Sequence, residues 1–491
     1  MDNKISSSQA APTEERRADN TESRVEYINH TQGLKMPATK ELPAAVRPVV
    51  HVMPPEFTLE TLITLLTCYG VYMPRVRLRY IYDKRPHVPV LQIVVVAPQS
   101  GNKSVIDYIV ARIMGRLRRR DKIYRRAEQE WKENPISEPD ANGQTHQRQR
   151  PVKAVINLGA TMSRTQLVMR ADAPERLWNE PLVLFLYTEE VQELVDNNKK
   201  DFAKIGTAIR KGFDFGSTLD QDYVSSYSAT PDLLLSHIVM GTQGGVDNFM
   251  NATELEQGGL TRKILLRLKG ELGDDAPVIR DFTQEEEHLI DATISTLMSH
   301  TYTRDEKNLM PVENLDMAWL DNTVKRWCDS IRREVKFSGS VATGTFYKRS
   351  SVSAFRLTAI LAKLYLLDPN RPANWQGLCR RAYRFLAGYI LDSLLTEWGG
   401  KYETIVARQA KEREGMKAPL YSICPDEFTR EWFSHVVTER GLAKSARQFL
   451  YTWKKNGWLV ENNEDETVIY HKTEKGRKAH DRLLNRKGGT A

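Results

Sequence analysis

The sequence predicts an α/β protein with a parallel β-sheet, followed by a helical domain and a small C-terminal module of helices and a β-hairpin. The apolar, β-branched run VPVLQIVVVA at residues 88–97 is typical of a strand that helices cover on both faces. Similar runs alternate with runs of helical periodicity up to about residue 273. Beyond that point apolar residues recur at helical spacing alone until about residue 421.

The composition is that of a globular chain of more than one domain. Its 491 residues exceed a single compact core, and 41% of them are hydrophobic. Apolar runs stay well short of the roughly 18 residues of a membrane-spanning helix. The first residues, MDNKISSSQAAPTEERRADN, lack the apolar segment of a secretory signal, so we expect a cytoplasmic protein. The widely spaced cysteines fit neither zinc nor redox motifs and predict buried thiols. They are Cys68, Cys328, Cys379 and Cys424.

The N-terminal third contains a strand, a loop and a long helix in that order. Residues 1–50 lack apolar periodicity and predict a disordered tail. The run FTLETLITLLTCYG then predicts a helix that ends at Gly70, ahead of short β-prone runs. The strand at 88–97 follows, then the loop PQSGNKS, then a helix without internal proline. Residues 134–151 are polar and turn-forming, and predict a surface loop.

A second alternation completes the α/β core, which we place at residues 51–275. Strands are predicted for VKAVINLGA, PLVLFLYTEE and PDLLLSHIVMGTQ, with a helix over VQELVDNNKKDFAKIGTAIRKGFDF. Residues 276–420 predict an α-helical domain without strands. From residue 421, two helical runs precede WLVENNEDETVIYHKT, which reads as two strands around an acidic turn. Helix, helix and hairpin is the order of a winged-helix-like module, which we place at 421–491.

The loop after the first strand carries a candidate phosphate site. In a phosphate-binding loop, backbone amides at a helix N-terminus surround the phosphates, a lysine reaches the β and γ oxygens, and a hydroxyl holds magnesium. Lys103 and Ser104 match the last two roles, with Gly101 and Asn102 completing the loop. The motif has glycines where Ala97 and Asn102 stand, although asparagine tolerates unusual backbone angles and Gly101 can shift the bend by one position. An ordinary strand-to-helix turn is the alternative.

Polar residues at the ends of the next strands are candidates for catalysis. Glu189 is a candidate magnesium ligand, although aspartate is usual there, and Glu190 is a candidate base that activates water. A solvated helix N-terminus, which favours acids, is the alternative. Thr242 ends the third strand and is a candidate sensor of the γ-phosphate. Arg262, in GGLTRKILLRLKG, is a candidate arginine finger for a neighbouring subunit, and an exposed arginine without that role is the alternative.

Basic residues predict a polyanionic partner. The net charge is +8, and the helix containing RIMGRLRRRDKIYRR concentrates arginines, although a solvated helix face is the alternative. Its candidate DNA contacts are Arg118, Arg119 and Arg120. In the C-terminal module, AKSARQFLYTWKKNGW would place basic side chains near phosphates, with protein docking as the alternative. Its candidate DNA contacts are Lys444, Arg447, Lys454 and Lys455.

The run of motifs resembles a family of RecA-like P-loop NTPases, long catalogued as a domain of unknown function, carried on bacterial plasmids, prophages and integrative elements. The resemblance covers roughly Pro54 to Pro369. It rests on the order of APQSGNKS, RRAEQEWKE, LFLYTEE, FAKIGTAIRKGFDF, LLLSHIVMGTQGGV, GGLTRKILLRL and SAFRLTAILAKL. It implies ATP and magnesium as cofactors and a replicative helicase or primase-associated ATPase, often ring-forming. It assigns the phosphate-loop, strand-end acid, sensor and family-arginine positions to Lys103, Ser104, Glu190, Thr242 and Arg262. The chain departs from the family pattern at Asn102 and Glu189.

We therefore expect an ATP-dependent, helicase-like DNA-remodelling motor in the replication or mobilisation of a mobile genetic element. Its expected partners are single-stranded DNA or a replication origin, further copies of the chain, and a primase or relaxase. The alternative is a non-catalytic DNA-binding adaptor, initiator or loader with a degenerate nucleotide site. A small-molecule enzyme is disfavoured because the sequence lacks a nucleophile–base pair, metal-spaced His or Cys residues and a dinucleotide fingerprint. His237, inside an apolar strand, is expected to be a satisfied core residue.

Overall fold

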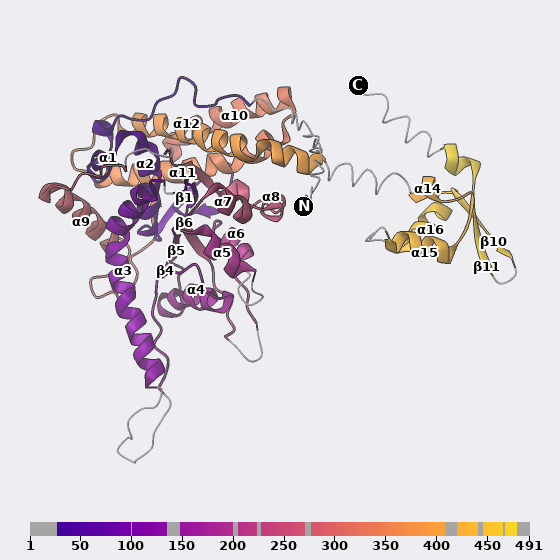
Figure 1. The fold of residues 1–491 in the computed structure, drawn as a ribbon, viewed down its shortest axis with the longest axis horizontal. Helices are drawn as coiled ribbons and strands as arrows, with labels where there is room; N and C mark the ends of the chain where they lie inside the picture. The colour runs from indigo at the N-terminus through magenta and orange to yellow at the C-terminus, as the bar shows by residue number, and fades with distance from the viewer. Residues whose placement is uncertain are drawn as a thin grey trace, which may run out of the picture. The chain divides into compact units, whose positions relative to one another are not determined.

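The computed structural model describes residues 27–99, 101–134, 148–199, 205–222, 227–270, 276–407, 420–439, 445–464 and 467–478. The chain forms two compact units (Figure 1). The larger unit comprises Met1–Asn251, Gly258–Ser338 and Ala342–Gly400. The smaller unit consists mainly of residues from Lys401 onwards.

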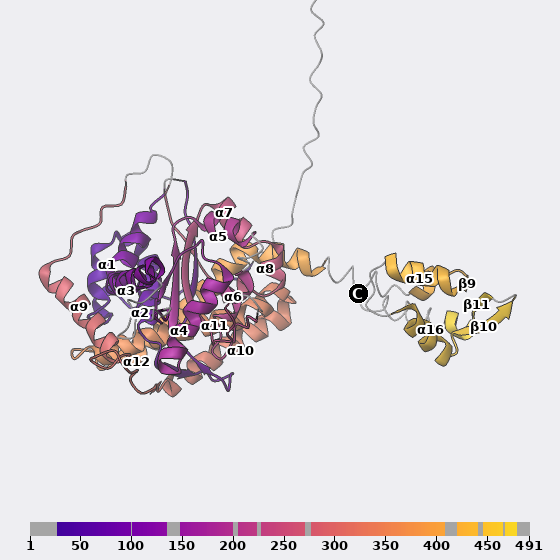
Figure 2. The same ribbon diagram turned by 90° about the horizontal axis from the view of Figure 1, so that it is seen from below.

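The larger unit is built on a five-stranded parallel sheet in the order β4-β5-β6-β3-β7. All residues of β3 and β6 are buried, as expected where helices cover both faces. Helices α2 and α3 lie on one side of the sheet, and α5 and α7 lie on the other (Figure 2). The predicted α/β class with a parallel sheet is confirmed. The strands are β3 (Gln92–Val96), β4 (Asn157–Leu158), β5 (Val183–Thr188), β6 (Leu234–Gly241) and β7 (Ile264–Arg267).

The helices that cover the sheet occur where the apolar periodicity predicts them, but some of their ends differ from the predicted ones. Helix α2 continues past Gly70, where a Cβ would lie 2.6 Å from the backbone oxygen of Pro89, so this glycine serves close packing and not helix termination. The predicted helix after β5 is divided into α5 and α6. The helices are α1 (Arg47–Val52), α2 (Thr58–Val71), α3 (Lys103–Glu133), α4 (Arg164–Trp178), α5 (Val191–Asn198), α6 (Gly206–Lys211) and α7 (Gln243–Phe249). Short 3-10 turns are η1 (Thr39–Glu41), η2 (Pro55–Phe57), η3 (Leu260–Arg262) and η4 (Ala318–Leu320).

Long helices follow the sheet in the sequence and belong to the same unit. They are α9 (Gln284–Ser299), α10 (Asp321–Ser338), α11 (Val341–Leu367) and α12 (Trp375–Leu394), after which a short π-helix, η5, covers Leu395–Gly399. In the described part of the chain, α11 is the one helix long and apolar enough to cross a membrane, and 89% of its apolar window is buried inside the protein. Its apolar character therefore matches a core position.

Two sequence-based expectations for this unit are wrong. Strands do occur beyond residue 273, because β8 (Glu313–Leu315) pairs in parallel with β1 (Val76–Arg79), which pairs antiparallel with β2 (Pro86–His87). A three-residue strand is too short to show an alternating pattern. The disordered tail does not extend to residue 50 either, since Val46 and Val49 are fully buried. Prolines interrupt this apolar segment and hide its periodicity.

Other expectations about buried residues are confirmed. All four cysteines are free and buried. His237 is a core residue, because its Nδ1 lies 3.0 Å from the backbone oxygen of Ile93 and its Nε2 lies 2.9 Å from Nζ of Lys263. Burial and the neighbouring ammonium group lower the pKa of His237 well below its ordinary value, so the ring is neutral.

The smaller unit has its own apolar core, which includes Phe433, Leu450 and Trp453. Its helices and hairpin follow in the predicted order, although a short strand, β9, precedes the two helices. The three strands form an antiparallel sheet in the order β10-β11-β9. Its elements are α8 (Ala252–Glu256), α14 (Leu420–Ile423), β9 (Glu427–Thr429), α15 (Arg430–Glu439), α16 (Ala446–Lys455), β10 (Leu459–Glu464) and β11 (Thr467–Lys472).

Candidate functional site

The loop between β3 and α3 turns sharply at Gly101 and ends at a left-handed residue. The amide of Gly101 donates to the backbone oxygen of Pro98 at 3.0 Å, and a Cβ on Gly101 would lie 2.3 Å from Cγ of Pro98. Asn102 follows with φ 38° and ψ 17°, a conformation that asparagine tolerates better than most residues. The substitution of asparagine for glycine is therefore compatible with the bend that this loop needs.

The side chain of Asn102 ties the loop to the neighbouring strand instead of capping the helix that follows. Its Nδ2 donates to the backbone oxygen of Lys269, just beyond β7, at 2.7 Å. Helix α3 consequently begins without a side-chain cap, whereas the side chains of Ser163, Thr242 and Thr283 cap α4, α7 and α9. Uncapped amides at a helix N-terminus are good donors to an anion. In α3 they include the amides of Lys103 and Ser104.

Lys103 connects this helix to the acidic end of β5. Its Nζ donates to Oε1 of Glu190 at 2.5 Å and to the backbone oxygen of Glu189 at 3.1 Å. The amide of Glu190 donates to Oγ1 of Thr188 at 3.2 Å, which fixes the turn after the strand. Because the Glu190 side chain is 60% exposed, this ion pair is worth at most about 1 kcal/mol. A phosphate group can therefore displace Glu190 from Lys103 at little cost.

Strand register brings the other strand ends to the same edge. The amide of Ala97, after β3, donates to the backbone oxygen of Gly241, the last residue of β6, at 2.9 Å. Thr242, the next residue after Gly241, therefore lies beside the phosphate-loop candidate. Its Oγ1 accepts a weak hydrogen bond from the amide of Gly245 at 3.5 Å. After β3 the chain continues to β4 at one edge of the sheet, whereas after β6 it continues to β7 at the other edge. Open α/β sheets bind ligands at such a switch point, outside the carboxyl ends of the strands.

Arg262 does not belong to this edge of the sheet. It lies in η3, directly before β7, and therefore at the amino edge. Its Nη2 lies 3.2 Å from Oδ2 of Asp214, and its Nη1 donates to the backbone oxygen of Gly258 at 2.9 Å. Burial and the nearby Arg349 lower the pKa of Arg262. Arg262 is therefore remote from the nucleotide site of its own chain, and its role as an arginine finger for a neighbouring subunit stays a prediction.

Arg267 is the arginine that the fold places at the carboxyl edge. It is the last residue of β7, and its side chain is 54% exposed. It forms an ion pair with Glu397, from η5, and donates to Oε1 of Gln243 at 3.0 Å. The sequence does not predict this position, because ILLR is a short strand without a strong local signal. The one hint in the sequence is that this arginine follows directly after the apolar run ILL, as a residue at the end of a strand does.

The residues at this edge fit a nucleotide with its magnesium ion. Ser104 and Glu189 are both exposed there and supply the hydroxyl and carboxylate oxygens that magnesium prefers. Among the described residues no group of three or more His, Cys, Asp or Glu side chains could hold a metal ion by itself. A magnesium ion at this edge would therefore depend on phosphate oxygens, as is usual for nucleotide sites.

The three arginines proposed as DNA contacts on α3 do not form one patch. The guanidinium of Arg118 lies over the ring of Tyr187, 5.3 Å from its centroid. That of Arg120 lies 5.0 Å from the centroid of Tyr302, with Nε and Nη2 buried. Of the three, Arg119 alone is exposed. Three consecutive residues point in three directions around a helix, so Arg118 and Arg120 do not share the exposed face of Arg119.

A different basic stripe remains available on α3. Its members are exposed, form no ion pair in the part of the chain that the structure describes, and follow each other at helical spacings of three and four. They are Arg119, Lys122 and Arg126. Other arginines hold α9 in place, because Arg112 binds Asp291 at 2.8 Å and Arg116 donates to Ser295 at 2.6 Å. A groove of about 610 Å³ runs between these two helices.

The smaller unit carries a mixed aromatic and basic stripe on α16. Tyr451 is 67% exposed, and Arg447 and Lys455, four residues to either side, are exposed too. Lys454 is less available because it pairs with Glu461. Lys444 lies outside the described residues. Tyr451 was not among the sequence candidates, although its helical spacing from the two basic residues was visible in the sequence.

Comparison with known proteins adds no relative: neither the protein-family models nor the curated proteins give a match.

Proposed function

We propose that this chain is an ATP-dependent, helicase-like DNA-remodelling protein with a RecA-like P-loop core, acting in the replication or mobilisation of a mobile genetic element. The observation that carries the proposal is the contact from Lys103, at the start of α3, to Glu190, at the end of β5. It spans the switch point of a parallel sheet, where a lysine, a hydroxyl, a strand-end acid and uncapped amides meet. That is the set of groups that phosphoryl transfer requires.

In this proposal each residue has a separate task. The amides of Lys103 and Ser104 receive the phosphates, and Lys103 leaves Glu190 for the β and γ oxygens. The released carboxylate of Glu190 can then accept a proton from the attacking water. Arg267 offers a positive charge at the same edge. Magnesium, held by Ser104 and Glu189 together with the phosphates, would neutralise charge on the transferred group.

The smaller unit supports the choice of DNA as the substrate. Its order of helix, strand, two helices and two strands fits a winged-helix-like module, in which α16 would enter a groove of the DNA. Arg447 and Lys455 would contact phosphates, with Tyr451 between them able to stack on a base. Single-stranded DNA or a replication origin, assembly with further copies of the chain, and a primase or relaxase partner remain part of this proposal.

The test is ATP turnover by the purified protein with and without single-stranded DNA, for the wild type, Lys103→Ala and Glu190→Gln. Lys325 is exposed on α10, outside the strand ends and helix start that form the site, so Lys325→Ala is the matched control. We expect DNA-stimulated hydrolysis that falls at least about a hundredfold in both site variants, since a general base contributes that much. Lack of turnover by the wild type at saturating ATP and DNA would refute the motor.

A second candidate function is a DNA-binding adaptor, initiator or loader with a degenerate nucleotide site. It is favoured because the polar side chains of the loop already have partners within the protein. Asn102 is hydrogen-bonded to Lys269, and Lys103 is hydrogen-bonded to Glu190. Under this alternative, Lys103→Ala leaves DNA binding unchanged, and neither the wild type nor the variant hydrolyses ATP. Measuring DNA affinity on the same samples therefore separates the two functions.

A further inference from the structure

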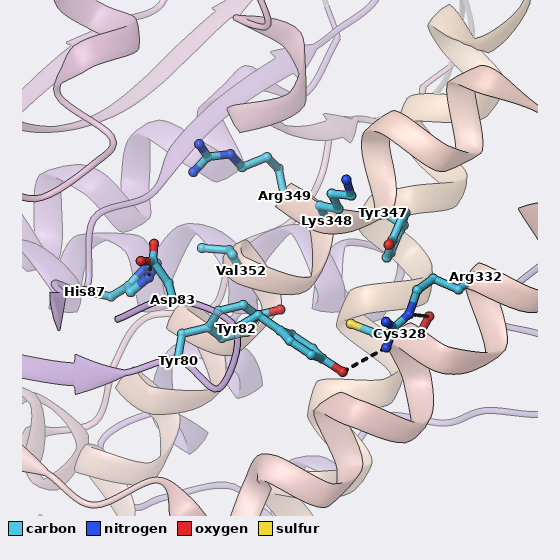
Figure 3. Close-up of a pocket in the computed structure, with 10 residues that line it drawn as sticks. All are labelled: Tyr80, Tyr82, Asp83, His87, Cys328, Arg332, Tyr347, Lys348, Arg349 and Val352. Atoms are coloured by element: carbon cyan, nitrogen blue, oxygen red, sulfur yellow. Dashed lines mark hydrogen bonds and ion pairs between the residues drawn. The ribbon is translucent and has the colours of Figure 1, made fainter. Parts of the chain in front are cut away.

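A second cavity lies in the larger unit, away from the phosphate-loop edge. It has a volume of about 330 Å³ and lies between the loop joining β1 to β2 and the helices α10 and α11 (Figure 3). The end of β2 leads into β3 from the amino side, so this cavity and Lys103 belong to opposite edges of the sheet. Small-molecule sites occupy roughly 300–1,000 Å³, which makes this cavity large enough for one small ligand.

The walls of the cavity are aromatic. Tyr80, Tyr82 and Tyr347 line it together with Val352. Tyr82 is 48% exposed, and its hydroxyl accepts a hydrogen bond from Nη2 of Arg332 at 3.1 Å. The guanidinium of Arg332 lies 5.5 Å from the centroid of the same ring. A half-exposed tyrosine held in place by an arginine is a ready surface on which a planar ring can stack.

The polar groups of the cavity are divided between two ends. Asp83 and His87 lie at one end, and Arg332, Tyr347 and Lys348 lie at the other (Figure 3). His87 Nδ1 accepts a hydrogen bond from Nη2 of Arg356 at 3.2 Å, while its Nε2 lies 3.3 Å from Oδ2 of Asp83 without hydrogen-bond geometry, so the acceptor nitrogen of the ring is already used. His87 is therefore not available as a base. The carboxylate of Asp83 is 41% exposed and can accept further hydrogen bonds.

At the basic end of the cavity Arg332 pairs with Asp329, and Lys348 carries the remaining positive charge. Lys348 is exposed and forms no hydrogen bond or ion pair in the described part of the chain. Arg349, which also lines the cavity, shares the single carboxylate of Asp214 with Arg262, at 2.7 and 3.2 Å. The buried Arg356 lies at the other end, beside His87. An anion at the basic end would therefore meet Lys348 as the lining cation that has no partner among the described residues.

We propose that this cavity binds one nucleotide unit, with its base against Tyr82 and Tyr347, an amino group of the base on Asp83, and its phosphate on Lys348. Stacking aromatics, an acceptor for an exocyclic amino group and a cation for phosphate are the three kinds of contact by which proteins hold a single nucleotide. The unit can come from a free mononucleotide or from one residue of a single strand. The site does not depend on turnover at Lys103, so it can be present in a motor and in an adaptor.

The test measures binding of dCMP and of a single-stranded oligo(dC) to the full chain carrying Lys103→Ala, in EDTA, by titration calorimetry. These conditions suppress a magnesium-dependent contribution from the phosphate-loop edge. The cavity variants are Lys348→Ala, which removes the phosphate contact, and Tyr82→Ala, which removes the stacking surface. Tyr82→Phe keeps the ring, and Lys325→Ala removes an exposed lysine outside the cavity.

We expect Lys348→Ala and Tyr82→Ala each to weaken binding by roughly tenfold, since a charge-assisted hydrogen bond or one stacked base has about that value. Tyr82→Phe and Lys325→Ala should bind within about twofold of the parent, less than the worth of one weak hydrogen bond. Loss of dCMP binding identifies a free nucleotide as the ligand, whereas loss of oligo(dC) binding alone identifies a strand. If neither ligand binds, or if the cavity variants bind both as tightly as the parent, the proposal is overturned.

Discussion

Arg262 and Arg267 lie at opposite ends of β7, and we expect their substitution to affect different properties. One change should lower stability, and the other should lower nucleotide affinity. Arg262→Ala should lower the free energy of unfolding by about 1–2 kcal/mol, because it removes a half-buried contact with Asp214. Arg267→Ala should change stability by less than about 1 kcal/mol, because that side chain is 54% exposed. It should instead weaken ATP binding by about tenfold, the value of one charge-assisted contact to phosphate.

Chemical denaturation and nucleotide titration of the two variants provide the measurement. The wild type serves as the reference for both assays. A loss of ATP affinity in Arg262→Ala without loss of stability would contradict the assignment, since it would place Arg262 at the nucleotide.

His87 should make the larger unit sensitive to acid. Burial and the neighbouring Arg356 lower its pKa to about 4, whereas in the unfolded chain it titrates near 6.5. Between these values the unfolded state binds a proton that the folded state does not, so stability falls as the pH drops from 6.5 to 4. The total loss is about 3 kcal/mol. His237, whose pKa is also lowered, contributes in the same direction, whereas the raised pKa of His30 contributes in the opposite one, so the comparison requires a variant.

Urea denaturation at several pH values, for the wild type and His87→Gln, isolates this contribution. The wild type should lose more stability than the variant over the window from pH 6.5 to 4, and the two curves should run parallel above pH 7. Parallel curves throughout would mean that His87 titrates normally in the folded protein.

At the scale of elements, the exposed stripe on α3 leads to a prediction about salt. The triple variant Arg119→Ala, Lys122→Ala and Arg126→Ala should bind single-stranded DNA more weakly. Its plot of log affinity against log salt should have a slope smaller by about two, because each lost phosphate contact removes about 0.7. Arg118→Ala is the matched control on the same helix, since its guanidinium lies over Tyr187. An unchanged slope in the triple variant would remove α3 from the DNA path.

The sequence predicted the elements with strong local signals. The strands β3, β5 and β6 carry continuous apolar runs, and the helices from α9 to α12 carry clear periodicity, so both groups were found. Short elements such as β7 and β8 have four and three residues and were missed, because their pairing with distant strands stabilises them and leaves little trace locally.

The part of the candidate site that follows strands with strong local signals could be predicted from the sequence. Lys103, Glu190 and Thr242 each follow a strand with a strong signal, so their common edge could be anticipated. The position of Arg267 depends on β7, and the orientation of Arg118 and Arg120 depends on tyrosines from other elements. Long-range packing decides such orientations, and a single sequence does not encode them in any local pattern.

At the scale of the whole molecule, the two compact units should unfold separately. The smaller unit has an independent core, in which the ring of Phe433 lies 5.2 Å from that of Trp453. Differential scanning calorimetry should therefore show two transitions. Phe433→Ala should destabilise the smaller unit by about 3–5 kcal/mol and leave the other transition in place. A single transition that shifts as a whole would show that the units unfold as one.

The strand order of the sheet also affects how the chain is made. β3 is synthesised early, but its two neighbours, β6 and β7, emerge only after residues 234 and 264. At ribosomal speeds the gap between β3 and β6 lasts on the order of ten seconds. During that time the wholly apolar segment IVVV has no strand to pair with, and unpaired apolar strands are prone to aggregate. Biosynthesis of this protein should consequently depend on a holding chaperone that binds the nascent chain until β6 has left the ribosome.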